Sequence, residues 1–119
     1  MSSFSVQVIK SSTMEIAIGI CGKSCLKNQY SRPEIHEVIY YRLAGKGSII
    51  KRFNKQDVGI TVKEGSIIDV KIETGNFSEI SWEVDGVRAG QAMIPAEMVN
   101  EGIYAYFEVF KKGDIIKIL

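Results

Sequence analysis

Residues 80–93, ISWEVDGVRAGQAM, decide the fold class of this chain. The first half of the stretch alternates apolar and polar residues, with Trp82 among the apolar ones. This alternation is typical of a strand that has one face in a core and the other in water. An Asp-Gly pair follows at 85–86, and both central positions of a type I′ turn need a positive φ, which Asp and Gly tolerate. The stretch therefore predicts a β-hairpin with Trp82 in the core, and Asp85 is interpreted as a turn residue rather than a catalytic acid.

The same period of two recurs along most of the chain. It is clearest in EIAIGI, SIIDVKIE and IYAYFEV, at residues 15–20, 66–73 and 103–109. Further strands are predicted at 4–9, 38–43, 48–53, 57–62, 87–94 and 114–119. Glycine-containing turn signals separate these runs, and only 94–102 is expected to form a helical turn, between Pro95 and Gly102. This pattern predicts an all-β fold, a two-sheet antiparallel β-sandwich.

Length and composition place the chain among ordinary globular domains. It has 119 residues, which suits a single domain over 1–119, with 45% hydrophobic and 24% charged residues. The net charge is +1 and the basic residues are spread out, so we expect neither nucleic-acid nor membrane binding. The start of the chain lacks an apolar run long enough for a signal peptide, and there are only two cysteines. We therefore expect reduced thiols and an intracellular location, cytoplasmic or nuclear.

The order and spacing of several segments resemble a SPRY domain. In the second half these are EGSIIDVKIE, the stretch at 80–93 and GIYAYFEVFKKGDIIKIL, and in the first half FSVQVI, IAIGIC and YYRLAGKGSI. The chain departs from the family pattern at Asp85, where the family has Asn, and at Trp82, where it has Phe. It also starts almost on the family's early strand, as a minimal or N-terminally trimmed version would. The resemblance implies a concanavalin-like sandwich, and a missing strand would leave an open edge able to pair with another chain.

Residues that carry chemistry do not form a recognisable catalytic or metal site. Cys21, Cys25 and His36 lack a usual zinc spacing and a fourth ligand, and a single cysteine–histidine coincidence says little about a nucleophile. Gly45 and Gly47 lack the third glycine and the following helix of a phosphate-binding loop. We therefore expect no enzyme activity, no cofactor and no metal.

The loops offer candidates for recognition. If the strands run strictly up and down, the connections 21–37, 54–56, 74–77 and 94–102 lie at one end of the sandwich. The longest, GKSCLKNQYSRPEIHE at 22–37, contains Asn28, Tyr30 and Arg32, and Tyr and Arg are enriched in interface hot spots. The alternative is a solvated loop with Tyr30 folded onto the core.

A second candidate surface is the strand that contains Tyr40, Tyr41 and Arg42. One of the two tyrosines must face outwards if the strand alternates, and Tyr41 and Arg42 are the predicted binding residues here. Tyr104 and Tyr106 share the wet face of a later strand, which is either a packed second layer or a contact patch.

The resemblance implies a non-catalytic protein-interaction module. Such a module binds a peptide segment or a protein surface through loops at one end of the sandwich, as an adaptor or subunit of a larger intracellular complex. Two alternatives stay open. One is a structural subunit held through a sheet face or an open edge. The other is a lectin-like sandwich that binds a small ligand through Asn28, Asn54 and Asp57.

Overall fold

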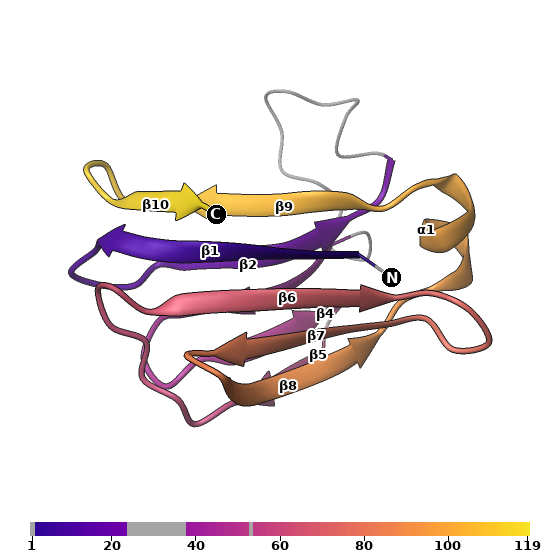
Figure 1. Cartoon of the computed structure of the whole chain (residues 1–119), viewed down its shortest axis with the longest axis horizontal. Helices are drawn as coiled ribbons and strands as arrows, with labels where there is room; N and C mark the ends of the chain where they lie inside the picture. Colours follow the sequence, from indigo (N-terminus) through magenta and orange to yellow (C-terminus); the bar gives the residue numbers. More distant parts are fainter. Residues whose placement is uncertain (1, 24–37, 53) are drawn as a thin grey trace.

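Two antiparallel five-stranded sheets pack face to face, as Figure 1 shows. The computed structural model describes residues 2–23, 38–52 and 54–119. The first sheet has the order β10-β1-β6-β7-β8 and consists of β1 (Ser2–Lys10), β6 (Ile67–Glu73), β7 (Glu79–Val84), β8 (Val87–Met93) and β10 (Ile115–Ile118). The second sheet has the order β5-β4-β3-β2-β9 and consists of β2 (Ile16–Cys21), β3 (Val38–Arg42), β4 (Ser48–Lys51), β5 (Asn54–Asp57) and β9 (Tyr104–Val109). The predicted all-β sandwich is confirmed.

The hairpin between β7 and β8 forms as the sequence predicts. Asp85 and Gly86 both have positive φ, 49° and 83°, and the strands resume with Val84 opposite Val87. The Asp85 carboxylate also accepts a hydrogen bond from the backbone N–H of Ile67, at 2.9 Å, and so fastens the turn to the start of β6.

Alternation along the strands places one face of each sheet in a shared core. Trp82 from the first sheet and Tyr41 from the second are both fully buried, and their rings meet edge to face at a centroid distance of 6.3 Å. Gly90 lies opposite Ile49 across the core, where an added Cβ would come within 2.4 Å of the Ile49 side chain. Trp82 is therefore a core residue, as predicted, and Gly90 allows the two sheets to approach closely at this point.

The connections separate into two ends of the sandwich. Figure 1 shows the 74–78 connection and helix α1 (Ala96–Glu101) at the end where β2 finishes and β3 begins. The β4–β5 turn lies at this end too, since Lys51 pairs with Asn54 and with Ile39. The predicted grouping is confirmed for these connections, but 54–56 belongs to β5 rather than to a loop. The one helical turn expected in 94–102 is α1, bounded by Pro95 and Gly102.

The strand predicted at 57–62 was wrong beyond Asp57. The backbone N–H of Val58 donates to the Gly47 carbonyl, and those of Gly59 and Ile60 both donate to the Lys46 carbonyl. Gly59 has a φ of 85°, which is incompatible with an extended strand. The segment therefore folds back onto the β3–β4 turn at the opposite end of the sandwich.

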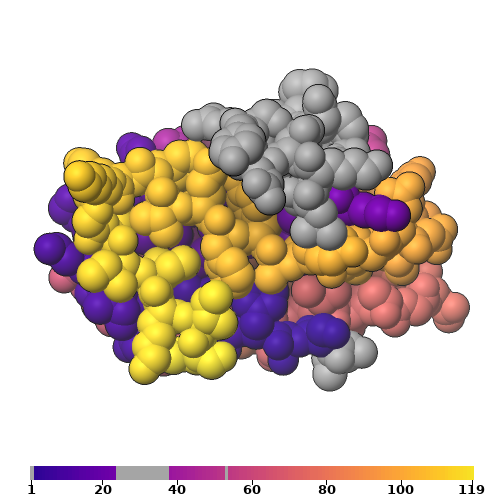
Figure 2. Space-filling model, turned by 90° about the horizontal axis from the view of Figure 1, so that it is seen from above, coloured from indigo at the N-terminus to yellow at the C-terminus, as the bar shows by residue number. Residues whose placement is uncertain are grey.

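One side of the sandwich carries the two edge strands β9 and β10. The early strand β1 is not an edge, because it lies between β10 and β6. Figure 2 looks onto this side, with the yellow C-terminal residues beside the indigo residues of β1. Three large apolar side chains on or next to β10 are about half exposed: Ile115 (50%), Ile118 (59%) and Leu119 (55%).

Cys21 is disulfide-bonded, so the expectation of a reduced thiol was wrong at this residue. The expectation rested on the small number of cysteines and on the lack of an apolar run typical of a signal peptide. Among the residues that the structure describes, no helix has the length and apolar character needed to cross a bilayer.

Candidate functional site

The strand register of the second sheet assembles a polar row on its outer face. Tyr41 pairs with Ile49 and both point into the core, so the next pair, Arg42 and Ser48, points outwards. Ser48 also pairs with Asp57 of β5. Lys55 lies two residues before Asp57 on the same strand and therefore shares this face. Arg42, Ser48, Asp57 and Lys55 thus meet on three neighbouring strands.

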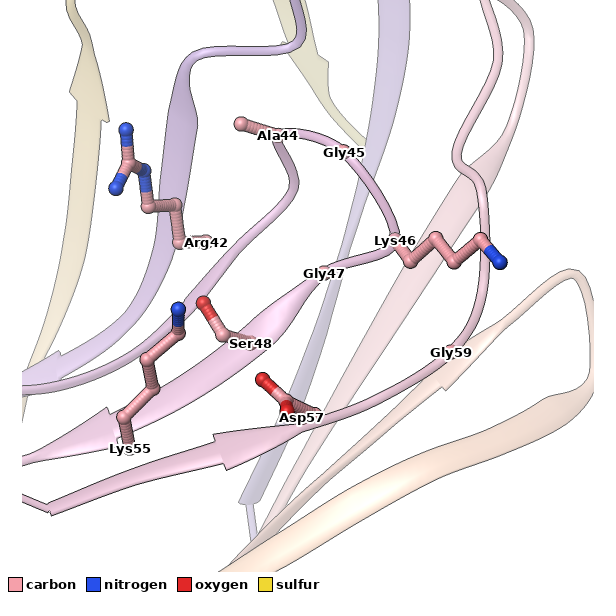
Figure 3. A pocket seen from close by; sticks show the side chains of 9 residues that line it. All are labelled: Arg42, Ala44, Gly45, Lys46, Gly47, Ser48, Lys55, Asp57 and Gly59. Atoms are coloured by element: carbon pink, nitrogen blue, oxygen red, sulfur yellow. The ribbon is translucent and has the colours of Figure 1, made fainter.

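These residues line an open hollow of about 440 Å³, which we call the Arg42 hollow. Figure 3 shows its lining, which comprises Arg42, Ala44, Gly45, Lys46, Gly47, Ser48, Lys55, Asp57 and Gly59. The Ser48 hydroxyl and the Lys55 ammonium group point into the same space, while the Lys46 side chain extends away from them. Ser48 is only 6% exposed, and its hydroxyl has no hydrogen-bond partner within the described ranges.

A second hollow adjoins the first and has an aromatic lining. It measures about 290 Å³ and is lined by Glu15, Tyr40, Arg42 and Phe110. We call it the aromatic hollow. Arg42 lines both hollows, so the polar and aromatic surfaces are continuous across its side chain.

Gly19 explains how the tyrosines of this face come together. It pairs with Tyr40 on one side and Tyr106 on the other, and the two rings approach to 6.1 Å between centroids. A glycine leaves room for aromatic side chains to lean over the strand from both neighbours. The outward ring of Tyr106 therefore packs against Tyr40 on the neighbouring strand.

A third hollow lies at the loop end of the sandwich. It measures about 230 Å³ and is lined by Gly22, Lys23, Arg52, Pro95, Glu97, Met98 and Glu101. We call it the loop-end hollow. It combines two basic and two acidic side chains with an apolar floor from Met98, which is 5% exposed.

The predicted site residues fall into three groups. Arg42 is exposed and lines two hollows. Asn28, Tyr30 and Arg32 lie outside the described residues. Tyr41 was a wrong choice as a binding residue, because it is fully buried against Trp82.

The outward tyrosine of β3 is Tyr40 and not the predicted Tyr41. A signal was present in the alternation itself. If the charged Arg42 faces water, the residue two positions earlier shares its face and Tyr41 faces the core.

The residues considered for a lectin-like site do not converge. Asn54 and Asp57 are three positions apart in β5 and therefore face opposite sides of the strand. Among the described residues, no group of three or more His, Cys, Asp or Glu side chains could hold a metal ion. Burial raises the pKa of Tyr41 to about 12, which reflects its place in the core.

Comparison with known proteins identifies the fold. No family model matches the chain, and no curated protein matches it in sequence. Among solved structures, the crystal structure of a human SPRY domain superposes with a TM-score of 0.76. The match covers 98% of this chain and 74% of that one, at 19% sequence identity. The chain therefore has a SPRY-like fold, as the order and spacing of its segments predicted.

Proposed function

We propose that this chain is a non-catalytic protein-interaction module that binds a peptide segment or a protein surface. The observation that carries the proposal is the position of Arg42, which joins a polar and an aromatic hollow on one sheet face. Arginine and aromatic side chains are enriched at the centres of protein interfaces. Adjacent polar and aromatic hollows suit an extended segment, because successive side chains of a bound peptide can occupy them in turn.

Asn28, Tyr30 and Arg32 are proposed as a second contact region at the loop end. The loop-end hollow supports this assignment, because Gly22 and Lys23 of its lining lead directly into the 24–37 segment. The Arg42 hollow lies at the β3–β4 turn, at the opposite end of the second sheet. The two regions can therefore be tested independently.

The experiment is a peptide-display selection followed by affinity measurement with three double variants. Tyr40→Ala/Arg42→Ala removes the sheet-face contacts, and Tyr30→Ala/Arg32→Ala removes the loop contacts. The control is Lys71→Ala/Glu83→Ala, which removes an exposed ion pair of 3.7 Å from the first sheet. We expect a selected peptide to bind at least about tenfold more weakly to one of the first two variants, the effect of losing one hot-spot residue. If neither the sheet-face variant nor the loop variant changes the affinity for the peptide, the proposal is wrong.

An adaptor or subunit role is the finer part of the proposal. The structural-subunit alternative has its own support in edge strand β10, where Ile115, Ile118 and Leu119 are about half exposed. An exposed apolar edge is a template for pairing with another strand. Sedimentation of the wild type and an Ile118→Lys variant separates the two roles. Self-association that Ile118→Lys abolishes favours the edge, and monomers at all concentrations favour the hollows.

The proposed intracellular location, cytoplasmic or nuclear, has its test in Cys21. Disulfides persist in oxidising compartments and are rare in the reducing cytosol. Thiol trapping with an alkylating agent before cell lysis reads the state of Cys21 directly. An alkylated Cys21 supports the proposed location, whereas a Cys21 that is disulfide-bonded in the cell contradicts it.

A further inference from the structure

We propose that the Arg42 hollow binds a phosphate monoester, held by Arg42, Ser48 and Lys55. This goes beyond the proposed interaction function, because it assigns a class of ligand to one hollow. It does not depend on the contacts proposed for the loop end of the sandwich. The hollow is open and polar, and its volume of about 440 Å³ accommodates a phosphate group with part of the molecule that carries it.

The charge of the hollow favours an anion. Its lining has three cationic side chains, Arg42, Lys46 and Lys55, and one carboxylate, Asp57, which gives a formal charge of +2. Within the described residues none of the four takes part in an ion pair. A phosphate monoester carries about −1.5 to −2 charges at neutral pH, so it matches this excess.

Ser48 supplies the second, independent observation. Its side chain is more than nine-tenths buried, lines the hollow and has no protein partner for its hydroxyl in the described part of the chain. The hydroxyl opens onto the hollow and is free to donate its proton, so a ligand acceptor placed there gains a hydrogen bond without displacing a protein partner. The position is therefore built for a group that accepts a hydrogen bond.

The register brings the donors within reach of one ligand. Ser48 lies directly opposite Arg42, and directly opposite residues of neighbouring strands have Cβ atoms about 5 Å apart. Lys55 is the diagonal neighbour of Ser48, at about 7 Å, because Ser48 pairs with Asp57 two residues along β5. Figure 3 shows the Lys55 side chain reaching towards the Ser48 hydroxyl, while the Arg42 guanidinium group extends away from it. A bound ligand therefore requires the flexible Arg42 side chain to turn towards Ser48.

The same donors discriminate between phosphate and carboxylate. Asp57 borders the hollow and repels any anion, so only a ligand that gains more than one charge-assisted hydrogen bond overcomes it. Phosphate offers three acceptor oxygens, enough for the arginine fork, the ammonium group and the hydroxyl together. A carboxylate has two oxygens and one charge. The arrangement therefore favours phosphate.

The test is a two-dimensional NMR titration of the ¹⁵N-labelled protein at constant ionic strength. The probes are N-acetyl-O-phosphoserine amide, glycerol 3-phosphate, N-acetylserine amide and N-acetylaspartate amide. We expect both phosphate esters to shift the amide signals of residues 44–48 and 55–59 saturably. We expect the serine amide to shift none of them, and the aspartate amide to bind about tenfold more weakly.

Three variants and one control locate the binding. Lys55→Gln, Ser48→Ala and Arg42→Lys each weaken phosphate-ester binding by about fivefold or more, the last because lysine keeps the charge but loses the planar fork. Lys117→Gln makes the same charge change on β10 of the other sheet and leaves the affinity unaltered. The amide spectra also report whether each variant is folded.

The outcomes decide the proposal. Non-saturating shifts, an equal loss in Lys117→Gln, or aspartate binding as tightly as phosphoserine would each overturn it. Tighter binding of the phosphoserine compound than of glycerol 3-phosphate, lost in Tyr40→Ala, supports a phosphate carried by a peptide beside the aromatic hollow. Equal binding of the two esters supports a site that recognises the phosphate group and not the molecule that carries it.

Discussion

The indole nitrogen of Trp82 donates a hydrogen bond to the backbone carbonyl of Ile18, over 3.0 Å and across the two sheets. Trp82 lies in the first sheet and Ile18 in the second, and both are fully buried. Most of the contact between the sheets is non-directional apolar packing. This bond adds a directional link between them, so it fixes how the face that carries Arg42 sits on the rest of the sandwich.

Replacing Trp82 with phenylalanine should lower the free energy of unfolding by about 2–4 kcal/mol. The variant loses the indole donor to Ile18 and leaves a cavity in a core that cannot fully collapse. Urea unfolding followed by circular dichroism measures the change, with Ser81→Ala on the outer side of β7 as the control. A loss below about 0.5 kcal/mol, the range of neutral surface substitutions, would show that the bond and the packing contribute little.

Gly19 should tolerate no side chain, for steric reasons alone. A Cβ at this position would lie 2.0 Å from the Ile39 carbonyl oxygen and 2.6 Å from the Tyr40 Cα, both backbone atoms. We expect Gly19→Ala to cost about 3 kcal/mol or more, beyond the usual range for overpacking. The matched variant is Gly59→Ala, where nothing lies within 4 Å but φ is +85°.

Gly59→Ala should lower the free energy of unfolding by about 1–2 kcal/mol, because an L-residue is strained in a left-handed backbone conformation. Denaturant midpoints of the two variants give the comparison. Equal destabilisation would contradict the prediction, because it would mean that the close approach at Gly19 relaxes freely.

Sequence patterns predicted those parts of the fold that depend on residues close together in the chain. The hairpin at 85–86 follows from turn chemistry, and the core position of Trp82 follows from alternation. The same reasoning failed at 57–62, because Gly59 ends β5 and the following amides bond to the β3–β4 turn. Those partners lie more than ten residues away in the chain, where no local pattern reports them.

The candidate site depends on strand register, which the sequence alone does not reveal. Arg42 was predicted, but its contact with Ser48 and the nearness of Lys55 follow from which residues pair across β3, β4 and β5. Phe110 joins the aromatic hollow from a segment nearly seventy residues later in the chain. Individual residues could therefore be proposed from the sequence, whereas the hollows that they form could not.

Asp85 should stabilise the hairpin in two ways: it tolerates a positive φ, and its carboxylate accepts a hydrogen bond from the Ile67 N–H. Asp85→Ala puts a side chain without an acceptor at a φ of 49° and loses the bond from the Ile67 N–H. We expect a cost of about 1–2 kcal/mol. Asp85→Asn keeps an acceptor oxygen and a residue that tolerates this angle, so its unfolding free energy should stay within about 0.5 kcal/mol of the wild type. Equal effects of the two substitutions in urea unfolding would rule out this role.

Tyr41 should make the stability of the domain fall at high pH. Burial raises the pKa of its phenol to about 12 in the folded state, whereas the unfolded chain ionises near the ordinary value of 10. The neutral phenol therefore contributes fully to stability below pH 10, and this contribution is lost as the pH rises from 10 to 12. Tyr41→Phe removes the ionisable group, so the unfolding free energy of the wild type should fall relative to the variant only within that window.

The same substitution should be harmless at neutral pH. The Tyr41 hydroxyl is buried and has no hydrogen-bond partner among the described residues, so its removal strands no other group. We expect Tyr41→Phe to be neutral or to stabilise the domain by up to about 1 kcal/mol. Urea unfolding of both proteins at neutral pH and at intervals up to pH 12 measures both effects. A clear destabilisation at neutral pH would mean that the hydroxyl is bonded in solution, and parallel pH profiles would mean that its ionisation is not coupled to folding.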